Sequence, residues 1–220
     1  MTRLMIVRHA EAEGNIIRRF HGQTDSHLTK NGHKQAQRVA ERLSNEHIDR
    51  LYSSDLSRAF QTAKYIGKVK NLDVHIIKGL REIDGGDWED MSWEELPQKW
   101  PVAYDHWENK PHLLQMPNGE SMTGLQQRVL KEIMEIVEEN HGKNICVVTH
   151  GVVKKALLCY FYDKPLEAFT DIMWHDNASV TMIHIEDDSY KVVIEGDNLH
   201  LGELGTLAKQ DWWKKDKNID

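Results

Sequence analysis

The sequence predicts an α/β protein, a three-layer α/β/α sandwich in which a mostly parallel central sheet lies between two layers of helices. Short apolar runs alternate with longer amphipathic segments over most of the 220 residues. Runs without polar alternation, such as residues 4–7 and 145–148, are typical of strands buried on both faces of a sheet. Strands that alternate with helices indicate a parallel sheet covered on both sides. A small irregular, partly helical insertion interrupts this pattern.

The first part of the chain contains five expected elements. Residues 4–9 predict a buried strand, and residues 27–43 predict a helix with apolar residues along one face. Thr29 is the expected N-cap of this helix, because a threonine side chain can accept a hydrogen bond from the first turn. A strand, a helix and another strand follow at residues 48–54, 55–68 and 72–77.

Residues 84–118 differ in character from the rest of the chain. They hold four of the seven tryptophans and several prolines. Ser92 and Glu95 have the spacing of a capping box, which indicates a short helix within this stretch. We interpret it as the insertion, and we expect it to cover the functional site.

The second part of the chain returns to regular elements. Residues 121–142 predict a long amphipathic helix, with Ser121 as N-cap and Gly142 just past its end. A strand at 144–150 leads directly into a helix at 151–162, and residues 178–185 and 190–196 form an antiparallel hairpin. We expect one domain over residues 1–205 and a polar tail at 206–220.

The composition is that of a globular protein with a packed core. Apolar residues make up 40% of the chain and charged residues 29%. The net charge of −7 argues against a nucleic-acid partner, and no apolar run is long enough to span a bilayer. Cys146 and Cys159 lie in apolar runs and are expected to be reduced core residues, so we expect a cytoplasmic protein.

Two histidines end two of the predicted strands. The runs "MIVRH" and "CVVTH" place His9 and His150 at strand ends, and ligands of α/β sheets bind beyond the C-terminal ends of strands. Parallel strands would bring both histidines to one edge. Arg8 and Arg58 could supply guanidinium groups for a phosphate there, and N–H groups at the start of the helix after His150 could face the same anion.

This set of residues suits phosphoryl transfer. A neutral imidazole can attack phosphorus to give a phosphohistidine, which water then hydrolyses. Nearby cations lower the pKa of such an imidazole and keep it neutral. The leaving oxygen needs a proton from a carboxylic acid. Residues 79–90 offer five candidate acids, among which spacing alone does not choose: Glu82, Asp84, Asp87, Glu89 and Asp90.

Six stretches of the sequence resemble one known family. "RHAEAEGN", "LTKNG", "SSDLSRAFQTA", "LREIDGGDWE", "NGES" and "VTHG", in this order, are similar to motifs of the histidine phosphatase superfamily, also called phosphoglycerate mutase-like. The resemblance runs from the first strand to the "NASVT" strand. It implies a three-layer α/β/α fold and catalysis without a metal or another cofactor.

The resemblance assigns roles by position within the motifs. It gives the phosphate-binding Arg8, the phosphorylated His9, the phosphate-contacting Asn15, the second arginine Arg58, the proton donor Glu82 and the second histidine His150. We also expect Gln23, in the loop after the first strand, and Gly151, at the start of a helix, to line the phosphate site. A solvated Gln23 is an equally good interpretation.

Two residues depart from the family pattern. Ala10 stands where the family usually has glycine, and a methyl group fits there unless the backbone needs a positive φ. Ala12 stands where the family commonly has Thr or Ser, and the missing hydroxyl would leave phosphate binding more dependent on Asn15.

The resemblance leaves three functions to compare. The acidic, tryptophan-rich stretch after Glu82 disfavours a second phosphate group, so we expect a phosphatase that acts on small phosphorylated metabolites, with water as acceptor. A phosphoglycerate mutase that depends on 2,3-bisphosphoglycerate and a catalytically inactive phosphate-binding or interaction module are the alternatives. The expected partner is a small phosphate ester, whereas nucleic acid and membrane are not expected. The sequence leaves open a monomer or a homodimer.

Metal and serine chemistry are not expected. The 13 histidines form no H-E-x-x-H motif, and the two cysteines form no C-x-x-C motif. Ser121 in "NGESMTG" does not have the spacing of a nucleophile elbow, and no predicted strand comes before it. Its expected role is therefore that of an N-cap.

Overall fold

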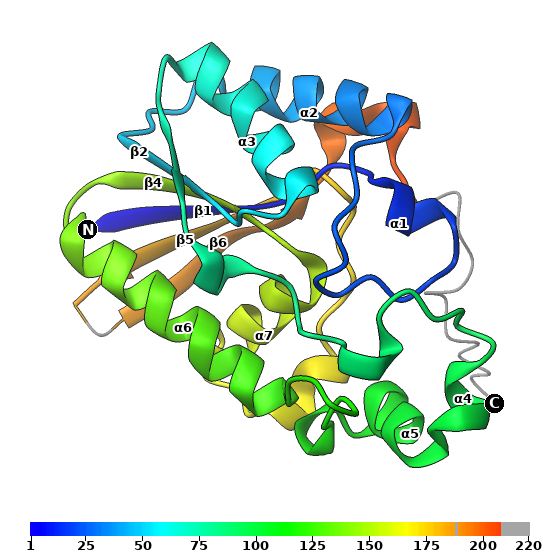
Figure 1. The fold of residues 1–220 in the computed structure, drawn as a ribbon. Helices are drawn as coiled ribbons and strands as arrows, with labels where there is room; N and C mark the ends of the chain where they lie inside the picture. Colours follow the sequence, from blue (N-terminus) through cyan, green and yellow to red (C-terminus); the bar gives the residue numbers. More distant parts are fainter. Residues whose placement is uncertain (188, 208–220) are drawn as a thin grey trace, which may run out of the picture.

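The computed structural model describes residues 1–187 and 189–207. Within them one six-stranded sheet forms the centre of the fold, in the order β3-β2-β4-β1-β5-β6 (Figure 1). The strands are β1 Thr2–Arg8, β2 Arg50–Ser53, β3 Val74–Ile76, β4 Asn144–Thr149, β5 Val180–Glu186 and β6 Ser189–Asp197. The first four are parallel, and β5 and β6 add an antiparallel hairpin at one edge. The predicted mostly parallel sheet is confirmed.

Helices cover both faces of the sheet, which confirms the three layers. In Figure 1, α2 and α3 lie on one face and α6 and α7 on the other. Their bounds are α2 Lys30–Leu43, α3 Ser57–Lys70, α6 Met122–Glu139 and α7 Gly151–Phe161. The remaining helical elements are α1 Glu13–Ile16, η1 Lys78–Leu80, η2 Gly86–Trp88, α4 Leu96–Lys99, α5 Pro101–Asn109, η3 Pro111–Leu113, η4 Leu166–Thr170 and η5 Leu199–Leu204.

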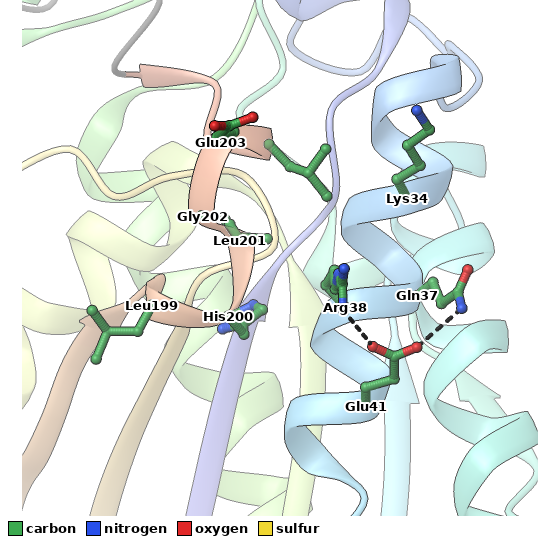
Figure 2. A pocket seen from close by; sticks show the side chains of 10 residues that line it. Lys34, Gln37, Arg38, Glu41, Leu199, His200, Leu201, Gly202 and Glu203 are labelled. Carbon is green, nitrogen blue, oxygen red and sulfur yellow. Dashed lines mark hydrogen bonds and ion pairs between the residues drawn. The ribbon is translucent and has the colours of Figure 1, made fainter.

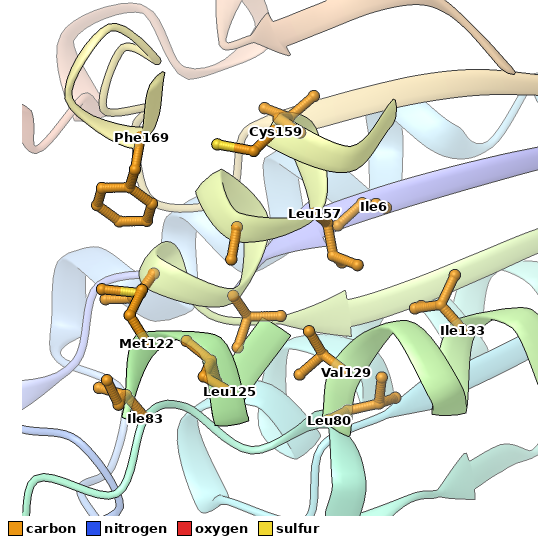
Figure 3. Close-up of a cluster of buried hydrophobic side chains, with 14 of the residues drawn as sticks. Ile6, Leu80, Ile83, Met122, Leu125, Val129, Ile133, Leu157, Cys159 and Phe169 are labelled. Carbon is orange, nitrogen blue, oxygen red and sulfur yellow. The ribbon is translucent and has the colours of Figure 1, made fainter. Parts of the chain in front are cut away.

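Alternate residues of the buried strands feed two hydrophobic cores. In β1, Leu4 and Ile6 join the α6–α7 side, whereas Met5 and Val7 join the α2–α3 side. The first of these cores includes Val129 of α6 and extends to η4 (Figure 3). Because both faces of β1 are buried, all four residues 4–7 are apolar. The polar groups of the candidate site come only where the strand ends.

The predicted helix starts are confirmed at two positions. The side chain of Thr29 accepts a hydrogen bond of 2.9 Å from the N–H of Gly32, and Ser121 accepts one of 3.0 Å from Gly124. The spacing of Ser92 and Glu95 has a different outcome. The Ser92 hydroxyl donates to the Glu95 carboxylate at 2.9 Å, but this contact closes a turn that comes before α4.

Residues 84–118 hold η2, α4, α5 and η3 and contribute no strand to the sheet. Their tryptophans pack around a residue of the loop that follows β1. The Phe20 ring lies 5.5 Å, between centroids, from each of Trp88, Trp93 and Trp107. The aromatic side chains thus form a small core that joins this segment to the loop after β1.

The chain end described by the structure packs against the domain. Thr206 and Leu207 are buried, and their N–H groups donate to the Asp176 carboxylate at 2.7 and 2.8 Å. Residues 208–220, most of the predicted polar tail, lie outside the described residues. Cys146 and Cys159 are buried and unpaired, as expected. Among the described helices none has the length and apolar character needed to cross a membrane.

A surface groove of about 550 Å³ lies between α2 and η5 (Figure 2). Glu41 lines it and accepts hydrogen bonds from two other lining residues, Gln37 and Arg38. None of the candidate site residues lines this groove. The candidate site is therefore a different part of the molecule.

Two glycines with positive φ differ in their surroundings, and the one in residues 84–118 is closely packed. Gly86 has φ +53°, and an added Cβ would lie 2.2 Å from the Pro117 carbonyl oxygen; Gly142 has φ +77° and nothing within 4 Å. We expect Gly142→Ala to lower the unfolding free energy by about 1–2 kcal/mol, the cost of a left-handed backbone, and Gly86→Ala to lower it by more. Urea denaturation of both variants measures this. Equal losses would contradict the close approach at Gly86.

Candidate active site

The register of two parallel strands brings the two histidines together. Arg8 of β1 pairs with Thr149 of β4, so the next residue of each strand is a histidine at the same edge of the sheet. The His9 N–H donates to the Thr149 carbonyl at 2.8 Å, and the His9 and His150 ring centroids lie 5.2 Å apart. The expected meeting of the two imidazoles is confirmed.

The surroundings of His9 favour a neutral ring with one defined tautomer. Its Nδ1 lies 2.8 Å from the carbonyl oxygen of Ala10, which can only accept, so Nδ1 carries the hydrogen. The lone pair is then on Nε2. Burial, followed by the charges of Arg58 and Arg8, holds the pKa of His9 well below that of an ordinary histidine. Such a ring is a nucleophile at neutral pH.

His150 is also buried, and its ring is held by a residue of a third strand end. Its Nε2 lies 2.9 Å from the Ser54 hydroxyl, directly after β2. Its Nδ1 has no hydrogen-bond partner among the described residues. Burial and the nearby Arg58 hold the pKa of His150 well below its ordinary value. Ser54 belongs to the "SSDLSRAFQTA" stretch, in which the family resemblance assigns a role to Arg58 alone.

The two arginines are held by backbone carbonyl groups. Arg8 Nη1 donates to the His175 carbonyl at 2.6 Å, and Arg58 donates to the Gly22 and Thr24 carbonyls at 2.7 and 2.9 Å. Neither guanidinium is within 4.0 Å of a carboxylate of the described residues. Burial lowers the pKa of Arg8 to about 10, and it lowers the pKa of Arg58. Both groups stay charged at neutral pH.

Asp55 does not pair with Arg58. Its carboxylate accepts two hydrogen bonds of 2.6 and 2.7 Å from Arg81. The two buried cations of the site are thus held without a direct ion pair, although the charge of Glu82 acts on both of them from a greater distance. Two guanidinium groups in this arrangement are suited to bind a phosphate.

The Glu82 carboxylate occupies the start of α7. It accepts hydrogen bonds of 3.0 and 3.2 Å from the N–H groups of Val152 and Val153, and one of 3.1 Å from Ile83. The expectation that these helix N–H groups face the phosphate is wrong at Val152 and Val153, because a carboxylate of the chain itself uses them. Burial raises the pKa of Glu82, and the backbone donors oppose this shift.

Asn15 lies in α1, and its amide is oriented by two donors. Its Oδ1 accepts from the Ala12 N–H at 2.9 Å and from Asn177 Nδ2 at 3.3 Å. Asn177 Nδ2 also donates to the His9 carbonyl at 3.0 Å. Asn177 thus links the loop before β5 to the ends of β1 and α1. Asn177 belongs to the "NASVT" stretch, and no pattern in the sequence indicates this role.

Comparisons with known proteins agree with this geometry. The family model described as "Histidine phosphatase superfamily (branch 1)" matches residues 4–198.

The chain belongs to the histidine phosphatase superfamily.

A curated relative, phosphoserine phosphatase 1 of Hydrogenobacter thermophilus, is 36% identical over 93% of this chain and 96% of its own. Phosphoglycerate mutase-like protein 4 of Arabidopsis thaliana is also 36% identical, over 93% of this chain and 89% of its own. The solved structure of Bacillus stearothermophilus YhfR is 35% identical, with a TM-score of 0.88 over 91% of this chain and 100% of that one. This histidine phosphatase is an enzyme, a phosphoric monoester hydrolase.

In this histidine phosphatase, Gln23 and Gly151 stand next to the predicted machinery. The Gln23 side chain donates to the Glu82 carbonyl at 3.2 Å and accepts from Arg81 at 3.2 Å. A Cβ on Gly151 would lie 3.3 Å from Arg8 Nε and 3.2 Å from the Trp174 ring. The glycine therefore leaves the Arg8 side chain the space that it occupies.

The replacement of glycine by Ala10 is compatible with the backbone. Ala10 is not among the described residues with positive φ, and its N–H donates to the Thr62 hydroxyl at 3.0 Å. A methyl group is therefore accommodated at this position.

Among the described residues no group of three His, Cys, Asp or Glu side chains is placed to hold a metal ion.

The lowered pKa values of the two histidines make stability depend on pH. Below about pH 6.5 these two histidines bind protons in the unfolded chain, whereas His9 and His150 stay neutral in the folded protein. The unfolding free energy therefore falls as the pH falls. Each histidine contributes a slope of up to about 1.4 kcal/mol per pH unit. We expect His150→Gln to reduce the slope between pH 6.5 and 5.5, measured by urea denaturation. Parallel curves for the variant and the parent protein would exclude a lowered pKa at His150.

Proposed function

We propose that this enzyme hydrolyses phosphate monoesters of small metabolites through a phosphohistidine formed on His9. The observation that carries the proposal is the setting of the His9 ring. Its Nδ1 is tied to the Ala10 carbonyl, and its low pKa keeps it neutral beside the cations Arg8 and Arg58. The family and the relatives named as phosphatases support the same reaction.

In the first step the phosphoryl group is bound by Arg8, Arg58, Asn15 and His150. Nε2 of His9 attacks phosphorus in line with the ester oxygen. The N–P bond forms as the P–O bond to the leaving group breaks, and Glu82 gives its proton to the leaving oxygen. Burial already raises the pKa of Glu82, and a phosphate dianion nearby raises it further by charge repulsion.

In the second step Glu82, now a carboxylate, takes a proton from water. The oxygen of this water attacks phosphorus, the N–P bond breaks, and His9 returns to its neutral form. Inorganic phosphate leaves the site, and Glu82 carries the proton needed for the next cycle. Phosphate positioning by fixed cations and one proton shuttle account for the whole reaction, so the proposal needs no metal.

The charge of the segment after Glu82 favours a phosphatase, which transfers the phosphoryl group to water, over a mutase. The stretch after Glu82 has three exposed carboxylates, Asp84, Asp87 and Asp90, which would repel a second phosphate group. A small phosphorylated metabolite is the proposed substrate, and the named activity of one relative makes phosphoserine the first compound to assay. We place the enzyme in the cytoplasm, which suits its two reduced cysteines.

The phosphohistidine can be trapped and located. We expect the parent enzyme, quenched during turnover of para-nitrophenyl phosphate, to carry one phosphoryl group that is lost in acid and retained in alkali. We expect His9→Ala to carry none and to lose at least about 10³-fold in kcat, as enzymes do when they lose their nucleophile. Mass spectrometry of the intact protein and of its peptides measures both. A phosphoryl group on another residue, or full activity of His9→Ala, would overturn the proposal.

The role of Glu82 predicts a dependence on the leaving group. An alkyl phosphate such as phosphoserine needs a proton at its leaving oxygen, whereas para-nitrophenolate leaves without one. We expect Glu82→Gln to lower the first-step rate about 10²–10⁴-fold for phosphoserine and much less for the aryl ester. Because the variant also lacks the base of the second step, it should show a burst of nitrophenolate and accumulate phosphoenzyme. Rapid-quench kinetics measure both steps, and equal losses for the two esters would exclude Glu82 as the acid.

A further inference from the structure

Glu89 is one of the five candidate acids, and the structure gives it a contact set unlike that of Glu82. Its Oε1 accepts from the N–H groups of Gln23 at 2.7 Å and of Gly85 at 3.0 Å. Its Oε2 accepts from the N–H of Thr24 at 2.9 Å and from the Thr24 hydroxyl. Four donors from two loops thus converge on one carboxylate, so its oxygens serve as acceptors that hold backbone in place.

The loop held by Glu89 is the loop that holds Arg58. The peptide unit between Gly22 and Gln23 gives its N–H to Glu89 and its carbonyl oxygen to Arg58. Thr24 also connects the two side chains, but through two different peptide units: its N–H donates to Glu89, and its carbonyl, in the next unit, accepts from Arg58. An anion on the N–H side of a peptide and a cation on its carbonyl side both align with the peptide dipole. In the Gly22–Gln23 unit each contact therefore strengthens the other.

The packing around this loop permits little displacement. A Cβ on Gly22 would lie 2.4 Å from Glu89 Oε1 and 2.2 Å from the Ile83 carbonyl oxygen. At the far end of the loop, Asp25 accepts from the N–H and the hydroxyl of Ser57, the first residue of α3, at 2.8 and 2.6 Å. The loop is therefore fixed by Glu89 on one side and by the helix that carries Arg58 on the other.

We propose that Glu89 is a positioning residue for phosphate binding, which acts by holding the carbonyl groups of Gly22 and Thr24 against the guanidinium of Arg58. It does not touch the phosphoryl group. Trp88, its neighbour in the chain, is fully buried in the aromatic core of residues 84–118. Glu89 consequently links that segment to the phosphate site. The inference rests on the proposed function only in assigning Arg58 to the phosphate.

The chemistry of the carboxylate makes a conservative substitution informative. Glutamine has the shape of glutamate, but its amide places an NH₂ donor where Glu89 presents an acceptor. Whichever way the amide turns, at least one backbone N–H faces another donor and loses its partner: that of Thr24 in one orientation, and those of Gln23 and Gly85 in the other. We therefore expect Glu89→Gln to release the loop, whereas Glu94→Gln, an exposed residue of the same segment, provides the matched control.

The test is a double-mutant cycle that measures the binding of inorganic phosphate by calorimetry, independent of turnover. We expect Glu89→Gln to weaken phosphate binding about 10-fold, Arg58→Ala to weaken it more, and Glu94→Gln to leave it unchanged. In the Arg58→Ala background, Glu89→Gln should add less than about 2-fold, since the group through which it acts is gone. A purely structural role of Glu89 would give the same added loss in both backgrounds, and would overturn the inference.

The cycle also separates this inference from the proposed function. If Arg58→Ala binds phosphate as tightly as the parent enzyme, both the phosphate role of Arg58 and the role of Glu89 are wrong. If Arg58→Ala weakens binding and Glu89→Gln does not, only the inference about Glu89 is wrong. Where Glu89→Gln fails to fold by circular dichroism, Glu89→Asp takes its place in the cycle. It keeps the charge but is one methylene too short to reach both loops, and the same non-additivity with Arg58→Ala is expected.

Discussion

The parallel pairing of β1 with β4 is the constraint on which the site depends. Because Arg8 is in register with Thr149, the residues that follow the two strands, His9 and His150, lie at the same edge of the sheet. β2, the other neighbour of β4, ends beside them and supplies Ser54. Three strand ends thus deliver an imidazole, a second imidazole and a hydroxyl to one point. A shift of one residue in this register would turn the histidines toward opposite faces.

The two arginines of the candidate site are held by neutral acceptors. Carboxylate partners would hold Arg8 and Arg58 equally well, but they would cancel the charge that a phosphate needs. Backbone carbonyl groups of Gly22, Thr24 and His175 orient the guanidinium groups and leave their charge in place. Burial, and after it the charges of Arg58 and Arg8, holds the pKa of His9 well below its ordinary value. In the proposed reaction the cations that bind the phosphoryl group therefore also help to keep the nucleophile neutral.

Local patterns in the sequence were sufficient for the strands, for the long helices α2, α3, α6 and α7, and for the two strand-end histidines, but not for short elements such as α1. Apolar runs located the strands of the sheet, and the N-caps Thr29 and Ser121 fixed the starts of two long helices, because these signals involve residues within a few positions of each other. The contacts that complete the site join distant parts of the chain. Val152 to Glu82 spans 70 positions and Asn177 to His9 spans 168. No sequence spacing indicates such pairs. The capping of α7 by Glu82 and the hydrogen bond from Asn177 to His9 are therefore known only from the structure.

The capping of α7 by Glu82 also has a consequence for the protonation of the Glu82 carboxyl group. The positive end of the helix favours an anion, and in this structure the N–H groups there donate to the carboxyl oxygens of Glu82. A phosphate dianion brought beside it competes for the same end of the helix dipole and pushes a proton onto the carboxyl group. In the proposed reaction a phosphate ester thereby favours the protonated form of the acid that its leaving oxygen needs, an effect that a neutral molecule of similar size would not have. Under that proposal the charge of the substrate matters for proton transfer as well as for binding.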